Sequence, residues 1–167
     1  MQVTLGRKGD YSVRAVLAVA RHSDSGRRKA REIAAEMEIP EPYLAQVLAD
    51  LVRHRLLTAM AGPTGGYSLS RPASEITLLE VTEAAEGPTT LESCVLRGGP
   101  CDWLTVCPIH ETWWRAQTAL RDSLAATTFA DMVAIDRAME DGTYQLPPEV
   151  PIHTAETKRG GIRTSET

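Results

Sequence analysis

The residues best suited to chemistry in this 167-residue chain are its three cysteines and the histidine that follows them. Cys94, Cys101, Cys107 and His110 form the pattern C-x6-C-x5-C-x2-H, and the chain has no other cysteine. Thiolates and imidazole bind soft metals, and a glycine-rich loop can fold around an ion or a cluster. Since random placement would scatter buried free cysteines, the grouping favours a metal site. The ligand count fits tetrahedral zinc, and it also fits an iron-sulfur cluster with one non-cysteine ligand.

The composition excludes several classes of protein. Hydrophobic residues make up 43% and charged residues 24% of the chain. No apolar run reaches the roughly 18 residues of a membrane span, and the polar residues 1–10 do not resemble a signal peptide, so we expect a cytoplasmic protein without disulfides and without a membrane partner. Phosphate-binding, zinc-protease, nucleophile-elbow and dinucleotide motifs are absent from the sequence, which argues against an enzyme.

The elements that must position the cysteines begin with three helices. Apolar residues at helical spacing predict a helix over residues 10–22. A second apolar set predicts a short helix around 33–37, which ends before Pro40 because the residue before a proline disfavours helical geometry. A third amphipathic helix runs from Pro42 to about Arg55. Two helices joined by a turn of about four residues, the second of them amphipathic, are typical of a helix-turn-helix motif.

A β-hairpin follows the third helix. Residues 57–61 are strand-like, 62–66 (GPTGG) favour a turn, and 67–70 alternate between apolar and polar. Three helices and a two-stranded hairpin predict a mainly α winged helix-turn-helix fold, in which the third helix enters the major groove.

The second half of the chain is again helical. Thr77 and Glu80 form a capping-box pattern before a helix that Gly87 and Pro88 close. After the cysteines, an apolar stripe predicts a long helix, and a shorter one covers 128–139. The stripe consists of Ile109, Trp113, Ala116, Leu120 and Leu124. Because a small domain could not bury it alone, we expect this helix to pair with its twin in a homodimer. We predict a winged-helix domain (1–75), a cysteine loop with dimerisation helix (76–141) and a disordered tail (142–167).

Charge is distributed unevenly along the chain. Residues 1–75 carry 11 basic against 8 acidic side chains, whereas residues 76–145 carry 4 against 11. A basic half joined to an acidic half is compatible with a nucleic-acid reader that carries a separate sensing or pairing half.

Three stretches, together with the spaced cysteines, resemble the IscR and NsrR type of bacterial winged-helix regulators, the Rrf2 family. They are residues 4–17 (TLGRKGDYSVRAVL), 39–48 (IPEPYLAQVL) and 62–69 (GPTGGYSL), and the likeness runs from about residue 2 to 135. The resemblance implies a dimeric transcription factor whose cysteine loop holds an iron-sulfur cluster that changes DNA binding.

The resemblance also implies the cluster ligands. Cys94, Cys101 and Cys107 correspond to the cysteine ligands of the family. His110 matches the histidine of IscR-like members, which hold a 2Fe-2S cluster, and Asp10 matches the aspartate of NsrR-like members, which hold a 4Fe-4S cluster. We favour His110 and the 2Fe-2S type, with zinc as the alternative metal. The alternatives for the two residues are a helix cap for Asp10 and a partly exposed residue near the start of the long helix for His110.

This sequence departs from the family pattern in two places. The first cysteine gap has six residues, where many members have five. Ala61 stands where IscR-like members have an arginine that enters the minor groove, and Arg53, Arg55 or Arg71 could supply that contact instead.

Candidate DNA contacts lie on the second and third helices and on the hairpin. Gln46 can pair with adenine, and Tyr43 can reach a phosphate. The start of the second helix is rich in cations that could neutralise phosphates or could equally belong to a solvated loop. The candidate DNA-binding residues are Arg28, Lys29, Tyr43, Gln46, Arg53 and Thr64, with Arg27 and Arg31 as neighbouring cations.

These features together predict a regulator of transcription. We expect it to bind a double-stranded operator as a homodimer, with an affinity controlled by an iron-sulfur cluster that senses redox state, nitric oxide or iron supply. The alternatives are a zinc-bound or thiol-sensing winged-helix regulator and a small iron-sulfur electron carrier.

Overall fold

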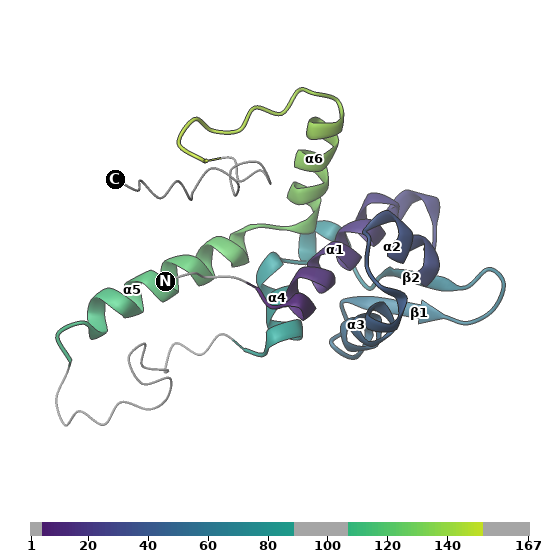
Figure 1. Cartoon of the computed structure of the whole chain (residues 1–167), viewed down its shortest axis with the longest axis horizontal. Coiled ribbons are helices and arrows are strands. Elements are labelled where there is room, and N and C mark those ends of the chain that lie inside the picture. The colour runs from purple at the N-terminus through teal and green to yellow at the C-terminus, as the bar shows by residue number, and fades with distance from the viewer. Residues whose placement is uncertain (1–4, 89–106, 152–167) are drawn as a thin grey trace, which may run out of the picture.

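The structure, a computed structural model, describes residues 5–88 and 107–151 (Figure 1). Short 3-10 turns lie at Ser23–Ser25 and Ala73–Glu75. The regular elements are α1 (Arg7–Arg21), α2 (Ala30–Glu36), α3 (Glu41–Arg53), β1 (Leu57–Met60), β2 (Gly66–Leu69), α4 (Leu78–Glu86), α5 (His110–Ala126) and α6 (Phe129–Glu140). The prediction of a mainly α winged helix is confirmed.

Helix α1 begins at Arg7, three residues before the start that hydrophobic spacing predicted. Asp10 therefore lies within the first turn of the helix and not at its cap, which is Gly6 without any side-chain bond. The interpretation of Asp10 as a helix cap is wrong. Hydrophobic spacing misses this first turn because it consists of charged residues and glycine, which do not continue the apolar stripe of the helix.

The turn between α2 and α3 has the predicted length. α2 ends at Glu36, and Glu38 adopts a left-handed conformation with φ of 52°. Ile39 is buried, and its N–H donates to the carbonyl of Ala34 at 3.0 Å, which closes the turn on the end of α2. Pro42 is the second residue of α3, where its missing N–H costs no helical hydrogen bond.

The hairpin after α3 forms the wing. β1 and β2 pair antiparallel, with Leu57 opposite Leu69 and Met60 opposite Gly66. A Cβ at Gly65 would lie 2.2 Å from the carbonyl oxygen of Met60, so only glycine fits at this point of the turn.

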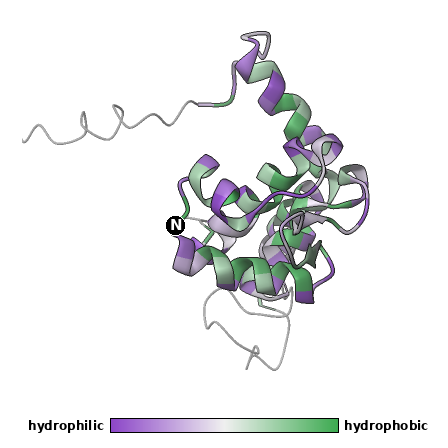
Figure 2. Cartoon of the chain, turned by 90° about the vertical axis from the view of Figure 1, so that its right-hand side faces the viewer, coloured by the Kyte–Doolittle hydropathy of each residue, from purple (hydrophilic) through white to green (hydrophobic). Residues whose placement is uncertain are grey.

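One hydrophobic core joins helices from both halves of the chain. The helices carry both hydrophobic and hydrophilic residues (Figure 2), and hydrophobic residues of α1, α2, α3, α4 and α6 meet in this core. Phe129, at the start of α6, is completely buried and belongs to this core. The other large core side chains include Val16, Val19, Ile33, Leu44, Leu48, Leu51, Leu57, Ile76 and Val81. The described residues on either side of position 75 therefore share one core.

The starts of α4 and α6 lie side by side. The N–H of Leu78 donates to the carbonyl of Thr127 at 2.8 Å, and the N–H of Phe129 donates to the carbonyl of Ile76 at 2.9 Å. These two bonds join residues that are 49 and 53 positions apart in the sequence and fix where α6 enters the core.

Helix α5 differs from the others because none of its residues is buried. It extends as an arm away from the helices around α1 (Figure 1), and Arg121 ties it to Glu83 of α4 at 2.7 Å. Beyond α6, residues 142–151 of the predicted tail form no helix or strand, and 152–167 lie outside the described residues.

Candidate nucleic-acid interface and metal ligands

Helix α3 divides cleanly into a buried and an exposed face. Leu44, Val47, Leu48 and Leu51 are buried, whereas Tyr43 and Gln46 are exposed. The Tyr43 side chain, 55% exposed, has its ring centroid 6.2 Å from that of Tyr11 on α1. The exposed face near the amino end of α3 is therefore free to enter a groove, and an aromatic contact orients one of its residues.

Arg53, at the carboxyl end of α3, combines exposure with a fixed partner. Its guanidinium is 69% exposed and donates from Nη2 to Oδ1 of the buried Asp50. The Asp50 carboxylate also pairs with Lys8 of α1 at 2.7 Å, and the hydrogen bond from Lys8 is the main cause that lowers the pKa of Asp50. The pair therefore places a basic group at the surface and a charged carboxylate beneath it.

The cations before α2 differ from one another in exposure and in their hydrogen-bond partners. Arg28 is three-quarters buried and donates from Nη2 to Glu36 at 2.6 Å, and its backbone exchanges two hydrogen bonds of 2.8 Å with Tyr67 on the wing. Arg28 thus joins the wing to α2, and its charge faces a carboxylate instead of solvent. Arg27 is exposed, and its Nη1 lies 3.4 Å from Oγ1 of Thr58. Lys29 lies directly before α2, where its N–H donates to Glu32.

The wing turn presents Thr64, which is exposed, and Ala61, also exposed, at the position where the resemblance implies an arginine. Arg71, one of the residues that could supply this contact instead, has partners within its own chain. Its guanidinium donates to the carbonyls of Arg55 and Glu75 and to the carboxylate of Glu80.

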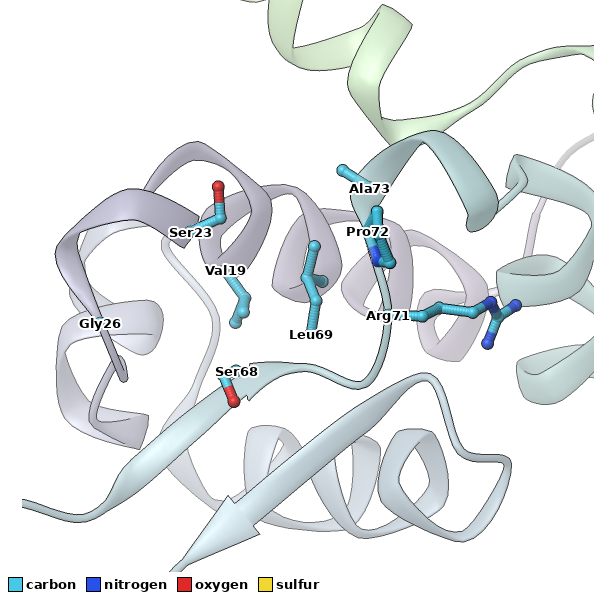
Figure 3. Close-up of a pocket in the computed structure, with 8 residues that line it drawn as sticks. All are labelled: Val19, Ser23, Gly26, Ser68, Leu69, Arg71, Pro72 and Ala73. Carbon is cyan, nitrogen blue, oxygen red and sulfur yellow. The ribbon is translucent and has the colours of Figure 1, made fainter.

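A cavity of about 340 Å³ lies between the end of α1 and β2, beside Arg71 (Figure 3). Val19 and Leu69 face it, and Ser23 and Ser68 add hydroxyls, whereas the Arg71 guanidinium points away from the other lining residues. The wing strand is therefore incompletely packed on α1 at this point.

Two of the five predicted metal ligands, Cys94 and Cys101, lie outside the described residues. Cys107 is a half-buried free thiol, and His110 is the exposed first residue of α5. The His110 N–H donates to the carbonyl of Cys107 at 3.0 Å, so one turn of chain presents both a thiol and an imidazole. This donor pair fits an iron-sulfur cluster or zinc. Within residues 5–88 and 107–151, no group of three or more potential ligands comes together.

Asp10, the fifth predicted ligand, lies on the first turn of α1. It lines a surface hollow of about 480 Å³ together with Leu5 and Val13. Its Oδ1 accepts a hydrogen bond of 2.9 Å from Nε of Arg14, and Nη1 of Arg14 donates to the carbonyl of Met37 at 3.2 Å. Asp10 is thereby linked through one side chain to the turn between α2 and α3.

Comparison with known proteins assigns the family. Residues 5–135 match the Rrf2 family of iron-dependent transcriptional regulators. The chain belongs to the Rrf2 family. It is similar to the helix-turn-helix transcriptional regulator IscR of Escherichia coli, with 32% identity over 147 residues that cover 88% of this chain and 90% of that one. The IscR of Sodalis glossinidius is 30% identical over 136 residues, with coverages of 81% and 82%.

Solved structures share the fold. The IscR of T. potens has a TM-score of 0.69 at 24% identity and covers 88% of this chain and 96% of its own. CymR, the global cysteine regulator of B. subtilis, has a TM-score of 0.68 at 24% identity, with coverages of 80% and 98%. Both likenesses concern the fold alone.

Membership of the Rrf2 family settles the class of function. The chain is a DNA-binding transcriptional regulator and not an enzyme, so the alternative of a small electron carrier is wrong. Across the described residues, no helix has both the length and the apolar character needed to cross a bilayer.

Lys8, Arg14 and Asp50 also take part in the arrangement of the site, and no motif in the sequence predicts a role for them. A signal for Asp50 exists, because it lies next to Leu51 and three residues after Val47, on the apolar stripe of α3. A charged residue on such a stripe requires a partner of opposite charge. The identity of that partner, Lys8 on another helix, depends on tertiary packing.

Proposed function

We propose that this Rrf2 regulator holds an iron-sulfur cluster whose state controls its affinity for operator DNA. The cysteine pattern, the donor pair of Cys107 and His110, and the description of the family as iron-dependent support this proposal. Cys94, Cys101 and Cys107 would hold the cluster, with His110 as the preferred fourth ligand of a 2Fe-2S type and Asp10 as that of a 4Fe-4S type. When bound, such a cluster supplies iron that reacts with oxygen or nitric oxide and changes its oxidation state.

If Asp10 is the fourth ligand, its link through Arg14 to the helix-turn-helix is the contact that would couple the cluster to DNA binding. Arg14 holds Asp10 with one nitrogen and the carbonyl of Met37 with another. Because Met37 follows directly after α2, a displacement of the first turn of α1 changes a hydrogen bond at the turn that sets the angle between α2 and α3. A regulator needs such a two-ended contact to convert a change near its sensor into a change at its DNA-binding face.

The proposed DNA interface uses the exposed face of α3 and the neighbouring cations. Gln46 would read base edges, Tyr43 and Arg53 would contact phosphates, Lys29 would add a phosphate contact beside α2, and Thr64 would reach the backbone from the wing. Arg28 has a different part, because its ion pair with Glu36 and its backbone bonds to the wing hold the interface together.

The proposed homodimer is built on α5. Trp114 and Leu120 are 46% and 45% exposed, and Ile109 precedes the helix with 41% exposure. A helix that leaves all its residues unburied gains little from packing on its own chain, and a second copy of α5 would cover these side chains.

The zinc-bound or thiol-sensing regulator remains the second candidate, because a thiol and an imidazole suit zinc equally well. Absorbance spectra with iron, sulfide and zinc analysis, on protein purified without oxygen, separate the two. We expect a brown protein, and the iron content per dimer distinguishes two-iron from four-iron clusters. His110→Ala and Asp10→Ala variants then identify the fourth ligand, since only the ligand's loss should lower iron retention.

A colourless protein that contains zinc after attempted cluster reconstitution would contradict the cluster proposal. The coupling itself is tested with Cys101→Ala, which should give a folded dimer with altered operator affinity. Unchanged affinity of this variant in both cluster-loaded and cluster-free preparations would refute the coupling.

A further inference from the structure

Asp50 is an unusual residue for the inner face of a helix. Its side chain is only 8% exposed, and it lies on α3 among the buried Val47 and Leu51. Its pKa is lowered, first by the hydrogen bond from Lys8, so the buried carboxylate is ionised at neutral pH. Desolvating a carboxylate is costly unless cations and hydrogen bonds compensate it, and an apolar residue would fill the same position without this cost. The carboxylate therefore requires an explanation other than packing.

Its two oxygens hold cations from two different helices. Oδ2 pairs with Nζ of Lys8 on α1 at 2.7 Å, and Oδ1 accepts from Nη2 of Arg53, one turn further along α3. Both cations reach the surface, with side chains 43% and 69% exposed. Lys8 thus anchors the carboxylate from α1, and the carboxylate in turn fixes Arg53.

The arrangement leaves most of the Arg53 guanidinium available. Among the contacts of the described residues, only Nη2 of Arg53 has a hydrogen-bond partner, so Nε and Nη1 remain available as donors on a side chain that is 69% exposed. A guanidinium that is already held in one place loses less side-chain freedom when it binds a phosphate. The Asp50 carboxylate thereby orients the Arg53 guanidinium while it uses only one of its nitrogens.

We propose that Asp50 is a positioning residue for DNA binding, which acts by holding Arg53 at the carboxyl end of the recognition helix. This inference rests on the proposed interface, in which α3 enters the groove and Arg53 contacts a phosphate. Lys8 serves as the anchor of the carboxylate on α1.

The sign of the effect separates positioning from simple electrostatics. Deleting an acid close to a phosphate backbone removes repulsion and should strengthen DNA binding. Deleting a residue that orients a phosphate-binding arginine should weaken it. Asp50→Asn removes the charge at nearly constant volume, so the direction of the change in affinity discriminates between the two effects.

The experiment uses the full chain and a duplex that the wild-type protein selects from a random-sequence pool. Fluorescence anisotropy gives the affinity of wild type, Asp50→Asn, Arg53→Met and the double variant, with circular dichroism to measure the folded fraction. Glu38→Gln is the matched control, because it makes the same charge change at an exposed residue of the helix-turn-helix. We expect Asp50→Asn to weaken binding about 2- to 10-fold. Glu38→Gln should not weaken it, and Asp50→Asn should add no loss to Arg53→Met.

A wild-type chain that selects no duplex refutes the proposed DNA interface itself. If wild type binds, unchanged or tighter binding of Asp50→Asn overturns the inference, and so does wild-type affinity of Arg53→Met. The inference is also overturned if Asp50→Asn lowers the affinity by the same factor in the wild-type protein and in the Arg53→Met variant. Should Asp50→Asn fail to fold, Arg53→Lys takes its place. Lysine keeps the charge but lacks the planar fork that can hold Asp50 and a phosphate together, so we expect a comparable loss, and unchanged binding overturns the inference.

Discussion

Replacing Phe129 with alanine tests whether α6 belongs to the same folding unit as the helix-turn-helix. Phe129 is the first residue of α6 and is 0% exposed, within the core that contains Val16 of α1 and Leu48 of α3. If the core is shared, a cavity made on α6 lowers the stability of α1, α2 and α3 as well. The perturbation lies far along the sequence from the recognition helix, so a local effect cannot imitate this outcome.

The magnitude follows from the burial of the ring. A phenylalanine side chain buries about 150–250 Å², which at about 25 cal/mol per Å² corresponds to about 4–6 kcal/mol. Alanine retains part of this burial, and the measured range for such a truncation is about 3–5 kcal/mol. For a chain of this size, a loss of 1 kcal/mol lowers Tm by about 2–4 °C, so we expect a fall of about 6–20 °C.

The assay is thermal unfolding followed by far-ultraviolet circular dichroism and, separately, by the fluorescence of the tryptophans. Met139→Ala is the control on the same helix, because Met139 is exposed and should cost less than about 0.5 kcal/mol. A Phe129→Ala protein that melts like wild type would refute the shared core. The shared core would also be refuted if α6 unfolded in a separate transition at low temperature and the protein still bound operator DNA above that temperature.

Further predictions concern the dimer, the wing, a helix cap and acid stability. Leu120→Glu should convert the proposed dimer into a monomer in light scattering, whereas Asp122→Asn on the same helix should leave it dimeric, and a dimeric Leu120→Glu protein would exclude α5 as the interface. Gly65→Ala should cost about 1–3 kcal/mol, because its Cβ meets a carbonyl of β1, and hydrogen exchange of the wing amides should accelerate. Thr77→Ala removes an N-cap bond of 3.2 Å and should lower unfolding free energy in urea by about 1 kcal/mol. The pKa of Asp50 is lower in the folded than in the unfolded chain, so unfolding takes up a proton and stability falls as pH drops below the ordinary value of 3.8. Asp50→Asn should therefore flatten the dependence of Tm on pH in acid, and an unchanged slope would contradict the pairing with Lys8.

The sequence predicted the elements well because their signals are local. Among the described residues, helical spacing predicted α1, α2, α3, α5 and α6, the glycine-rich turn predicted the wing, and Thr77 with Glu80 predicted the capping box of α4 that the structure confirms. The start of α1 was missed because Arg7 and Gly9 do not continue the apolar stripe. Hydrophobic periodicity cannot detect a helical turn that contains no apolar side chains.

The contacts between elements could not be predicted in the same way. The periodicity of residues 128–139 indicates a helix, yet it does not say that Phe129 fills the core beside α1. The sequence pattern treats the cations before α2 alike, as phosphate contacts or as a solvated loop, whereas packing places Arg28 against Glu36 and leaves Arg27 exposed. Which cation meets which carboxylate depends on partners far away in sequence, as with Lys8 and Asp50.

The paired hydrogen bonds between Leu78 and Thr127 and between Ile76 and Phe129 bring the two ends of a long excursion of the chain together. Lengthening a loop whose ends are already joined costs little, about 0.6 kcal/mol for each doubling. The number of residues between α4 and α5 can therefore change without moving the helices of the proposed DNA interface. During evolution, proteins of this fold could therefore replace the segment between α4 and α5 and respond to a different signal, while their winged-helix domain stays the same.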